Sequence, residues 1–251
     1  MEKCNGTVSS ATKGWQNEPM YFEEPTMSEA LRINDDFDHR VVIRPDDYHW
    51  VPSPMPGVER MMLDRIGDEV ARATTIVRYA PNSEFSSHTH GGGEEYFVLE
   101  GLFSDERGDY PAGAYVRNPI GTSHTPKIGP EGATIFVKLH QFAKEDTEQK
   151  VIHTRESQCY PGIVPGLQVM PLHEYRTEHT ALVKWASNTQ FNPHRHWGGE
   201  EILVLEGTFY DEHGVYPKGS WLRSPHLSQH TPYTKSDGAL IFVKTGHLGK
   251  E

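Results

Sequence analysis

The hydrophobic residues of this chain fall in short runs that are rich in β-branched and aromatic side chains. Such runs occupy residues 74–79 (TTIVRY), 96–101 (YFVLEG) and 133–139 (ATIFVKL), and similar ones occupy 181–185, 202–207 and 239–245. Between them lie turn sequences such as FSDERGDYPAG, in which Gly, Pro and Asp supply turn chemistry. Short strands separated by frequent Gly and Pro turns are typical of β-sandwiches and barrels, and no long amphipathic helix is apparent. We therefore predict an all-β protein.

The same pattern occurs twice. Aligning the chain with itself at an offset of 106 residues needs no gap from Val77/Val183 to Lys138/Lys244, and about half of the positions are identical. A period of this length is that of a whole small domain, so we predict two similar domains in series. We expect a flexible N-terminal arm over residues 1–35, a first domain over 36–143, a polar linker over 144–158 and a second domain over 159–251.

Composition narrows the class of protein. The 251 residues carry a net charge of −11, which disfavours binding to nucleic acid by phosphate neutralisation. No apolar stretch is long enough for a membrane-spanning helix, and the first residues lack the apolar core of a signal peptide, so we expect a cytoplasmic protein that binds neither nucleic acid nor membrane. The two cysteines, Cys4 and Cys159, form no disulfide framework and no CxxC zinc motif.

Candidate chemistry comes from the spacing of histidines. In His88-x-His90 the two side chains point to the same face of an extended strand, and Glu94 and His124 follow at spacings that a barrel can bring together. Imidazoles with one carboxylate are ordinary ligands for Zn, Fe, Mn or Ni ions. The second copy repeats the set, so we predict two divalent metal ions per chain, with the ligands His88, His90, Glu94, His124, His194, His196, Glu200 and His230.

These residues also carry a family resemblance. His88, His90, Glu94 and Gly101, followed by Gly113, Pro119, Gly121 and His124, resemble the two cupin motifs. The second copy differs in having Leu227 where a glycine is expected, and Ile128 and Thr234 stand where an asparagine often follows the last histidine. The surrounding sequence is similar to the ChrR-type cupin branch, which includes the C-terminal domain of zinc anti-sigma factors and dioxygenase-like cupins. The resemblance implies two tandem double-stranded β-helix (jelly-roll) barrels, each with a metal inside.

Several other recurring residues are weaker candidates. Glu95 and Glu201 should face away from the metal, in a solvated or inter-barrel position. For Arg117, Arg223, Lys138 and Lys244 we expect salt bridges at strand rims rather than substrate contacts. We assign the aromatic side chains to the core and expect the remaining histidines to be structural or exposed; these residues are Tyr96, Phe97, Phe103, Phe136, Phe209, Phe242, His49, His153, His173, His179 and His247.

Three functions fit this pattern. The first is a metal-dependent, dioxygenase-like enzyme acting on a small organic molecule; since no separate nucleophile and base appear, the metal would carry the chemistry. The second is a ligand- or stress-sensing regulator. An anti-sigma role is disfavoured because only about 35 residues precede the first barrel, too few for the helical zinc domain of those proteins. The third is a purely structural metalloprotein. A homodimer is compatible with all three.

The two predicted sites differ beside their ligands. Residues 120–123 are Ile-Gly-Thr-Ser before His124, whereas residues 226–229 are His-Leu-Ser-Gln before His230. Thr89 and Gly91 in the first copy correspond to Arg195 and Trp197 in the second. We therefore expect the first site to be the more open, and the one where substrate is converted.

Overall fold

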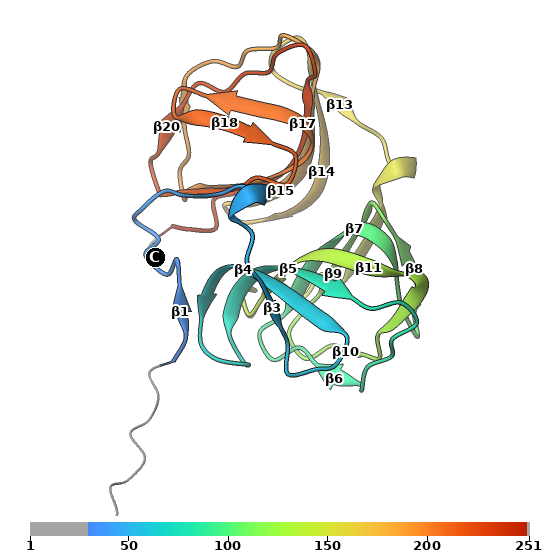
Figure 1. Ribbon diagram of the computed structural model, residues 1–251. Helices are drawn as coiled ribbons and strands as arrows, with labels where there is room; N and C mark the ends of the chain where they lie inside the picture. The colour runs from blue at the N-terminus through green and yellow to red at the C-terminus, as the bar shows by residue number, and fades with distance from the viewer. Residues whose placement is uncertain (1–29, 250–251) are drawn as a thin grey trace, which may run out of the picture.

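The computed structural model describes residues 30–249, which form two β-barrels joined by a short connection (Figure 1). The first barrel is built on a sheet with the order β1-β4-β5-β11-β7-β9-β12, with β3 on β4 and β8 on β7, and β6 pairs with β10. Its strands are β1 (Arg32–Ile33), β3 (Trp50–Pro52), β4 (Val58–Ile66), β5 (Arg72–Tyr79), β6 (His88–Thr89), β7 (Glu94–Asp105), β8 (Gly108–Pro111), β9 (Ala114–Asn118), β10 (Ser123–His124), β11 (Lys127–Leu139) and β12 (Lys150–His153).

The second barrel repeats this plan. Its main sheet has the order β13-β14-β15-β21-β17-β19-β2, with β18 on β17, and β16 pairs with β20. Its strands are β2 (Val41–Ile43), β13 (Tyr160–Pro161), β14 (Leu167–Tyr175), β15 (Glu178–Trp185), β16 (His194–Arg195), β17 (Glu200–Asp211), β18 (Gly214–Pro217), β19 (Trp221–Ser224), β20 (Gln229–His230) and β21 (Ala239–Thr245). The helices of the described residues are two short 3-10 turns, η1 (Pro45–Asp47) and η2 (Thr154–Glu156). The prediction of two tandem all-β barrels is confirmed.

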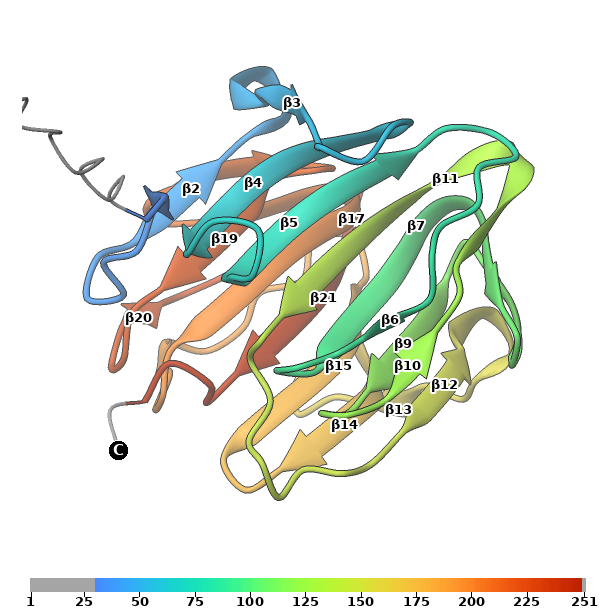
Figure 2. The same cartoon turned by 90° about the horizontal axis from the view of Figure 1, so that it is seen from below.

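Alternation along the long strands produces three hydrophobic clusters. Inward-facing residues such as Tyr96, Val98 and Phe103 fill the first barrel, and Ile202, Val204 and Phe209 fill the second. The residues between them in sequence point the other way, so the main sheets of the two barrels face each other across a third cluster (Figure 2). That cluster contains Phe97, Phe136, Leu203, Trp221 and Phe242. A strand such as β7 is therefore apolar on both faces, which explains its unbroken hydrophobic run.

The barrels exchange strands. β2 lies in sequence between β1 and β3 of the first barrel but pairs with β19 of the second, with Val42 opposite Leu222. β12 lies in the segment 144–158 that we expected to be a linker, yet it pairs with β9 of the first barrel, with Val151 opposite Val116. Each barrel is therefore completed by the segment that leads into the other. Of the expected N-terminal arm, residues 1–29 lie outside the described part of the chain, and β1 at its end pairs with β4.

Charged residues are buried between the facing sheets in a reciprocal pattern. Lys244 of the second barrel lies 2.7 Å from Glu95 of the first, and Lys138 of the first lies 2.5 Å from Glu201 of the second. Burial is the largest single effect and would raise the pKa of each glutamate. The opposing lysine, together with Arg117 at Glu95 and His247 at Glu201, outweighs it and lowers the pKa in both cases. Of the two positions we considered for these glutamates, the structure places them in the inter-barrel one.

We expected four basic residues to form salt bridges at the rims of strands, and this location is wrong. The structure buries all four of them: Lys138, Lys244, Arg117 and Arg223. Arg223 contacts Asp64 of the other barrel at 3.1 Å, and Arg117 pairs with Asp146, which also contacts His173. These pairs form because a charge removed from water needs a partner of opposite charge. Lys138 and Lys244 recur in the two copies together with their partners Glu201 and Glu95, and this recurrence reflects the inter-barrel interface rather than a shared surface feature.

We predict that Lys138→Met destabilises the protein by about 3–5 kcal/mol, because the buried Glu201 would lose its closest cation and would have to stay charged without it or take up a proton. Lys138→Met combined with Glu201→Gln should recover a large part of the loss. The free energy of unfolding in urea measures both effects. Lys127→Met is the matched control, since that lysine pairs with Glu84 at the surface, with side chains 61% and 72% exposed, and should cost less than about 1 kcal/mol.

The buried pairs of Glu95 with Lys244 and of Glu201 with Lys138 also determine how the stability of the protein should depend on pH. Because the pKa values of Glu95 and Glu201 lie below those of an unfolded chain, their contribution to stability is present at neutral pH and is lost as the pH falls below about 4. If Lys138→Met lowers the free energy of unfolding by no more than the control Lys127→Met does, this account of the interface is contradicted.

Candidate metal centres

A two-stranded ladder at the open end of each barrel brings the histidines together. In the first barrel β6 pairs with β10 so that His88 lies directly opposite His124. After β6 the chain turns at residues 91–93 and enters β7 at Glu94. Gly93 adopts a φ of 78°, and a Cβ atom there would lie 2.3 Å from the ring of Phe142, so this turn requires glycine. His194 opposes His230 in the same way in the second barrel.

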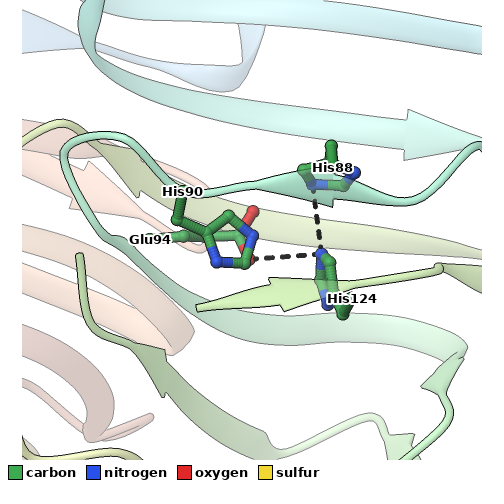
Figure 3. A group of neighbouring side chains, drawn as sticks. All are labelled: His88, His90, Glu94 and His124. Carbon is green, nitrogen blue, oxygen red and sulfur yellow. Dashed lines mark hydrogen bonds and ion pairs between the residues drawn. The ribbon is translucent and has the colours of Figure 1, made fainter. Parts of the chain in front are cut away.

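The four side chains of the first site converge on one point (Figure 3). We call His88, His90, Glu94 and His124 site one; one ligand atom from each lies within 4.8 Å of all the others. The Nε2 atoms of His88 and His124 are 3.2 Å apart, and Oε2 of Glu94 lies 3.3 Å from Nε2 of His90 and 3.7 Å from Nε2 of His124. His90, Glu94 and His124 are buried, whereas His88 is exposed.

The second site has nearly the same geometry. We call His194, His196, Glu200 and His230 site two, which meets the same 4.8 Å limit. The Nε2 atoms of His196 and His230 are 3.0 Å apart, and Oε2 of Glu200 lies 3.4 Å and 3.5 Å from them respectively. The structure thus brings together all eight residues that the sequence nominated as ligands.

The opposite ring nitrogens of several histidines are held by neighbouring groups. In site one Nδ1 of His124 lies 3.1 Å from Asp105, Nδ1 of His90 lies 2.9 Å from the Thr122 hydroxyl, and Nδ1 of His88 faces the Ser86 carbonyl at 3.3 Å. In site two Asp211 and the Asn192 carbonyl take the corresponding positions beside His230 and His194. These contacts leave the Nε2 atoms turned toward the centre, as in metal sites where outer groups orient the ligands.

Some of these supporting residues were missed in the sequence. Asp105 and Asp211 recur at the same position in both copies, and that recurrence was the available signal. Asn118 donates to Oε2 of Glu94 at 3.1 Å from the neighbouring strand β9, but its counterpart is Ser224, so the repeat did not point to it. Tyr110 and Tyr216 donate to the two aspartates at 2.8 Å and fix their orientation.

The donor sets fit a divalent transition metal. Two ligand atoms each about 2.1 Å from one ion are about 3.0–3.4 Å apart when the bond angle lies between a right angle and the tetrahedral value. The nearest pairs in both sites, at 3.0–3.4 Å, match this spacing. In addition, Nε2 of His90 is buried and has no hydrogen-bond partner among the described residues. A buried nitrogen aimed at other ligand atoms costs free energy unless something binds it.

The electrostatics of the ion-free sites also suit a cation. Burial lowers the pKa of His90 and of His196 to about 3, with further lowering by the neighbouring histidines, so both rings are neutral at pH 7 and can donate a lone pair. Burial raises the pKa of Glu94 and of Glu200 to about 7. A proton therefore occupies each carboxyl part of the time at neutral pH, and a divalent ion would displace it.

The entrances of the two sites differ as the sequence indicated. At site two Trp197 is 70% exposed and packs edge-on against His226, and Arg195 donates to Gln229 at 3.2 Å. Leu227 has a φ of 62°, a conformation that usually requires glycine; its counterpart Gly121 has a φ of 86° and open space around it. At site one the counterparts of Arg195, Trp197 and Leu227 are the smaller Thr89, Gly91 and Gly121. His88 is exposed, whereas His194 is half-buried. Site one is the more open.

The exchanged segments also reach toward the sites. Arg40, just before β2, donates to Asp211 of the second barrel at 2.7 Å and to the hydroxyl of Tyr216. Gln149, just before β12, donates instead to Asn118 of the first barrel at 3.3 Å. Site two therefore has an arginine bound at 2.7 Å to the aspartate that supports His230, whereas in site one Arg107 lies 3.9 Å from the corresponding Asp105.

A comparison with protein families decides what kind of barrel this is. The model of the ChrR cupin-like domain matches two segments, residues 38–143 and 147–249, which together cover most of the chain. The chain belongs to the ChrR cupin-like domain family. Both copies of the repeat are therefore cupin domains, and the two donor sets are cupin metal-site candidates.

Solved structures share the cupin fold at low sequence identity. A candidate dioxygenase from Nostoc punctiforme has a TM-score of 0.70 at 16% identity, covering 85% of each chain. A candidate glyoxylate-induced protein from Pseudomonas aeruginosa has a TM-score of 0.67 at 15% identity, covering 88% of this chain and 91% of its own. Oxalate decarboxylase from Lactobacillus farciminis has a TM-score of 0.59 at 10% identity, covering 82% and 85%. None of the curated proteins matches the sequence. In the described residues no helix has the length and apolar character needed to cross a membrane.

We predict that each chain of this cupin binds up to two divalent ions. His88→Ala with His90→Ala should remove about half of the bound metal, because these residues supply half of the donors of site one. Adding His194→Ala with His196→Ala should remove the rest. Elemental analysis of protein purified without added metal provides the measurement, and full loading of the quadruple variant would show that the metal lies elsewhere.

We also predict that metal binding releases a proton from each site near neutral pH. Since the pKa of Glu94 and of Glu200 is about 7, affinity should fall about tenfold between pH 8 and pH 6 as the carboxyls become protonated. Calorimetry with Zn²⁺ in buffers of different ionisation enthalpy counts the protons directly. Equal heats in all buffers at pH 6.5 would contradict the raised pKa.

Proposed function

We propose that this cupin is a metal-dependent, dioxygenase-like enzyme that acts on a small organic molecule, and that site one is where the substrate is converted. The observation that carries the proposal is the convergence of three imidazoles and one carboxylate at a site whose fourth side, at His88, is open to solvent. A divalent ion bound there supplies Lewis-acid or redox chemistry. The similar fold of the candidate dioxygenase from N. punctiforme supports the reaction class, and the ion could be Zn, Fe, Mn or Ni.

The side chains around site one have defined tasks in this proposal. Asp105 and Thr122 hold His124 and His90 in place, and Asn118 orients the carboxylate of Glu94. The small residues Gly91 and Gly121 leave room for a substrate beside His88. The closely packed barrel interior, with Phe103 against the ring of His124, keeps bulk water from the inner side of the site.

A buried hydroxyl further distinguishes site one. Tyr96 shares the inward face of β7 with Glu94, and its ring packs against Phe103 and Tyr110. Its hydroxyl is buried without a hydrogen-bond partner among the described residues. Ile202 stands at the corresponding position of the second barrel. Tyr96 is therefore suited to donate a hydrogen bond to a bound oxygen-containing substrate, and site two has no equivalent group at that position.

Site two fits a structural or ligand-sensing task better. Trp197, the residue after the ligand His196, packs against His226, and Leu227 replaces the glycine of site one. A sensing role for the whole protein, like that of regulatory cupins, is the second candidate. It is favoured by this asymmetry, because a site that binds metal behind a narrow entrance can report a ligand without converting it.

We predict that the two sites contribute unequally to turnover. Protein loaded with Fe²⁺ or Mn²⁺ is assayed for oxygen consumption against a panel of small carboxylic acids and diols. His88→Ala should lower turnover by at least about 100-fold because it removes a ligand of the open site, whereas His194→Ala should leave it within about threefold. Full turnover after loss of site one, with none after loss of site two, would reverse the assignment.

Tyr96→Phe is the matched variant within the same barrel. It removes only a hydroxyl that has no partner, so the free energy of unfolding should not fall, while turnover falls about tenfold. If no metal-loaded form acts on any compound of the panel but a compound changes the unfolding temperature, the sensing role replaces the enzymatic one.

A further inference from the structure

A cleft of about 400 Å³ lies between the two barrels, apart from both metal sites. Its floor is apolar and comes from the facing sheets, where Phe97 and Leu99 of β7 meet Leu203 and Leu205 of β17. Along β7, Glu100 at the cleft is six residue steps from Glu94 at site one, a distance of about 20 Å on an extended strand. The cleft is therefore a separate place for a ligand, and its volume is within the range of small-molecule pockets.

The strand exchange builds the two ends of this cleft. Directly after η1 in sequence, the hydroxyl of Tyr48 donates to the carbonyl of Gly219 in the second barrel at 2.5 Å. At the start of η2, the hydroxyl of Thr154 donates to the carbonyl of Gly113 in the first barrel at 2.6 Å. Gly113 and Gly219 correspond in the repeat, so each crossing segment closes one end of the cleft with the same contact. The cleft is thus a fixed part of the inter-barrel framework.

The charges at the cleft do not follow the repeat. Arg78, Arg155 and Lys218 line it, and none of them makes an ion pair with a described residue. The guanidinium of Arg78 stacks on the ring of Trp50 at 3.7 Å, and Trp50 lies edge-on to Tyr48. Lys218 directly precedes the glycine that Tyr48 contacts. Two unpaired cations therefore flank an aromatic pair at one end of an apolar cleft.

Two carboxylates, Glu100 and Glu206, also line the cleft, but they do not neutralise these cations. Glu100 is separated from Arg78 across the sheet by Thr134, and neither glutamate makes an ion pair with a described residue. The cleft carries more positive than negative side chains although the whole chain has a net charge of −11. A local excess of cations beside aromatic and aliphatic surface is complementary to an anion with an apolar body.

We propose that this cleft binds an amphiphilic organic anion, a flat apolar molecule with one acidic group. The apolar body would lie on the leucine and phenylalanine floor, and the acidic group would lie between Arg78 and Lys218. The site is independent of the proposed enzymatic function, since its residues belong to neither metal centre.

The test uses the full chain and two fluorescent probes with the same apolar body. 8-Anilinonaphthalene-1-sulfonate carries an acidic group, and N-phenyl-1-naphthylamine lacks it. We expect saturable binding of one sulfonate probe per chain, about tenfold tighter than the neutral probe. Arg78→Gln with Lys218→Gln should weaken the sulfonate probe about tenfold and leave the neutral probe nearly unchanged. Leu205→Trp, which fills the cleft, should weaken both.

A matched control comes from the repeat. Lys184 is the counterpart of Arg78, is also exposed, and does not line the cleft, so Lys184→Gln should leave both probes unaffected. Unfolding temperatures establish that each variant is folded. Equal affinities for the two probes, or unchanged sulfonate binding in the Arg78→Gln, Lys218→Gln and Leu205→Trp variants, would overturn the proposal. Binding that survives in the quadruple histidine variant supports a site separate from the metals, whereas its loss there would place the probe at a metal centre.

Discussion

The structure depends on the alternation of two adjacent glutamates on one strand. On β7, Glu94 points into the barrel and Glu95 points out of it, and Glu200 and Glu201 do the same on β17. Both members of each pair are buried, but their surroundings have opposite effects. Burial among histidines raises the pKa of Glu94 to about 7, while Lys244 and Arg117 hold the pKa of Glu95 far below its usual range. One residue step therefore separates a metal-ligand candidate from an inter-barrel ion pair.

Buried ion pairs at this interface are better understood as determinants of position than as a source of net stability. Two apolar sheets can slide or rotate against each other with little change in buried area. A misplaced lysine, in contrast, leaves two buried charges without partners. The reciprocal pairs of Lys244 with Glu95 and of Lys138 with Glu201 are satisfied together in only one arrangement of the barrels. Because β7 and β17 begin at the metal-site candidates, that arrangement also sets how the two sites lie relative to each other.

Much of the fold and of the candidate sites could be predicted because the relevant information is local. Strand runs, turns and the histidine spacings can be read over a few residues, and the repeat at 106 residues shows that His88 and His194 belong to equivalent settings. The location of Lys138 and Lys244 could not be predicted, since only packing of one barrel on the other buries them. The role of Asn118 could not be predicted for a related reason. Its side chain donates to Glu94 on a neighbouring strand, and its counterpart in the second copy is Ser224. The pairing of β2 and β12 also depends on partners far away in sequence.

The exchange of these two strands has a consequence for how such a chain can arise. Consider one such barrel as a separate molecule, with its leading strand pointing away from it. The edge of its sheet, at the strand equivalent to β9 or β19, would be exposed. A strand able to cover that edge would come from a second molecule. Two identical barrels would then complete each other as a symmetric pair. Joining them head to tail preserves every strand pairing and makes the association permanent at any concentration. It also allows the sequences of the two halves to diverge, and in this chain they differ in the residues beside the two metal-site candidates.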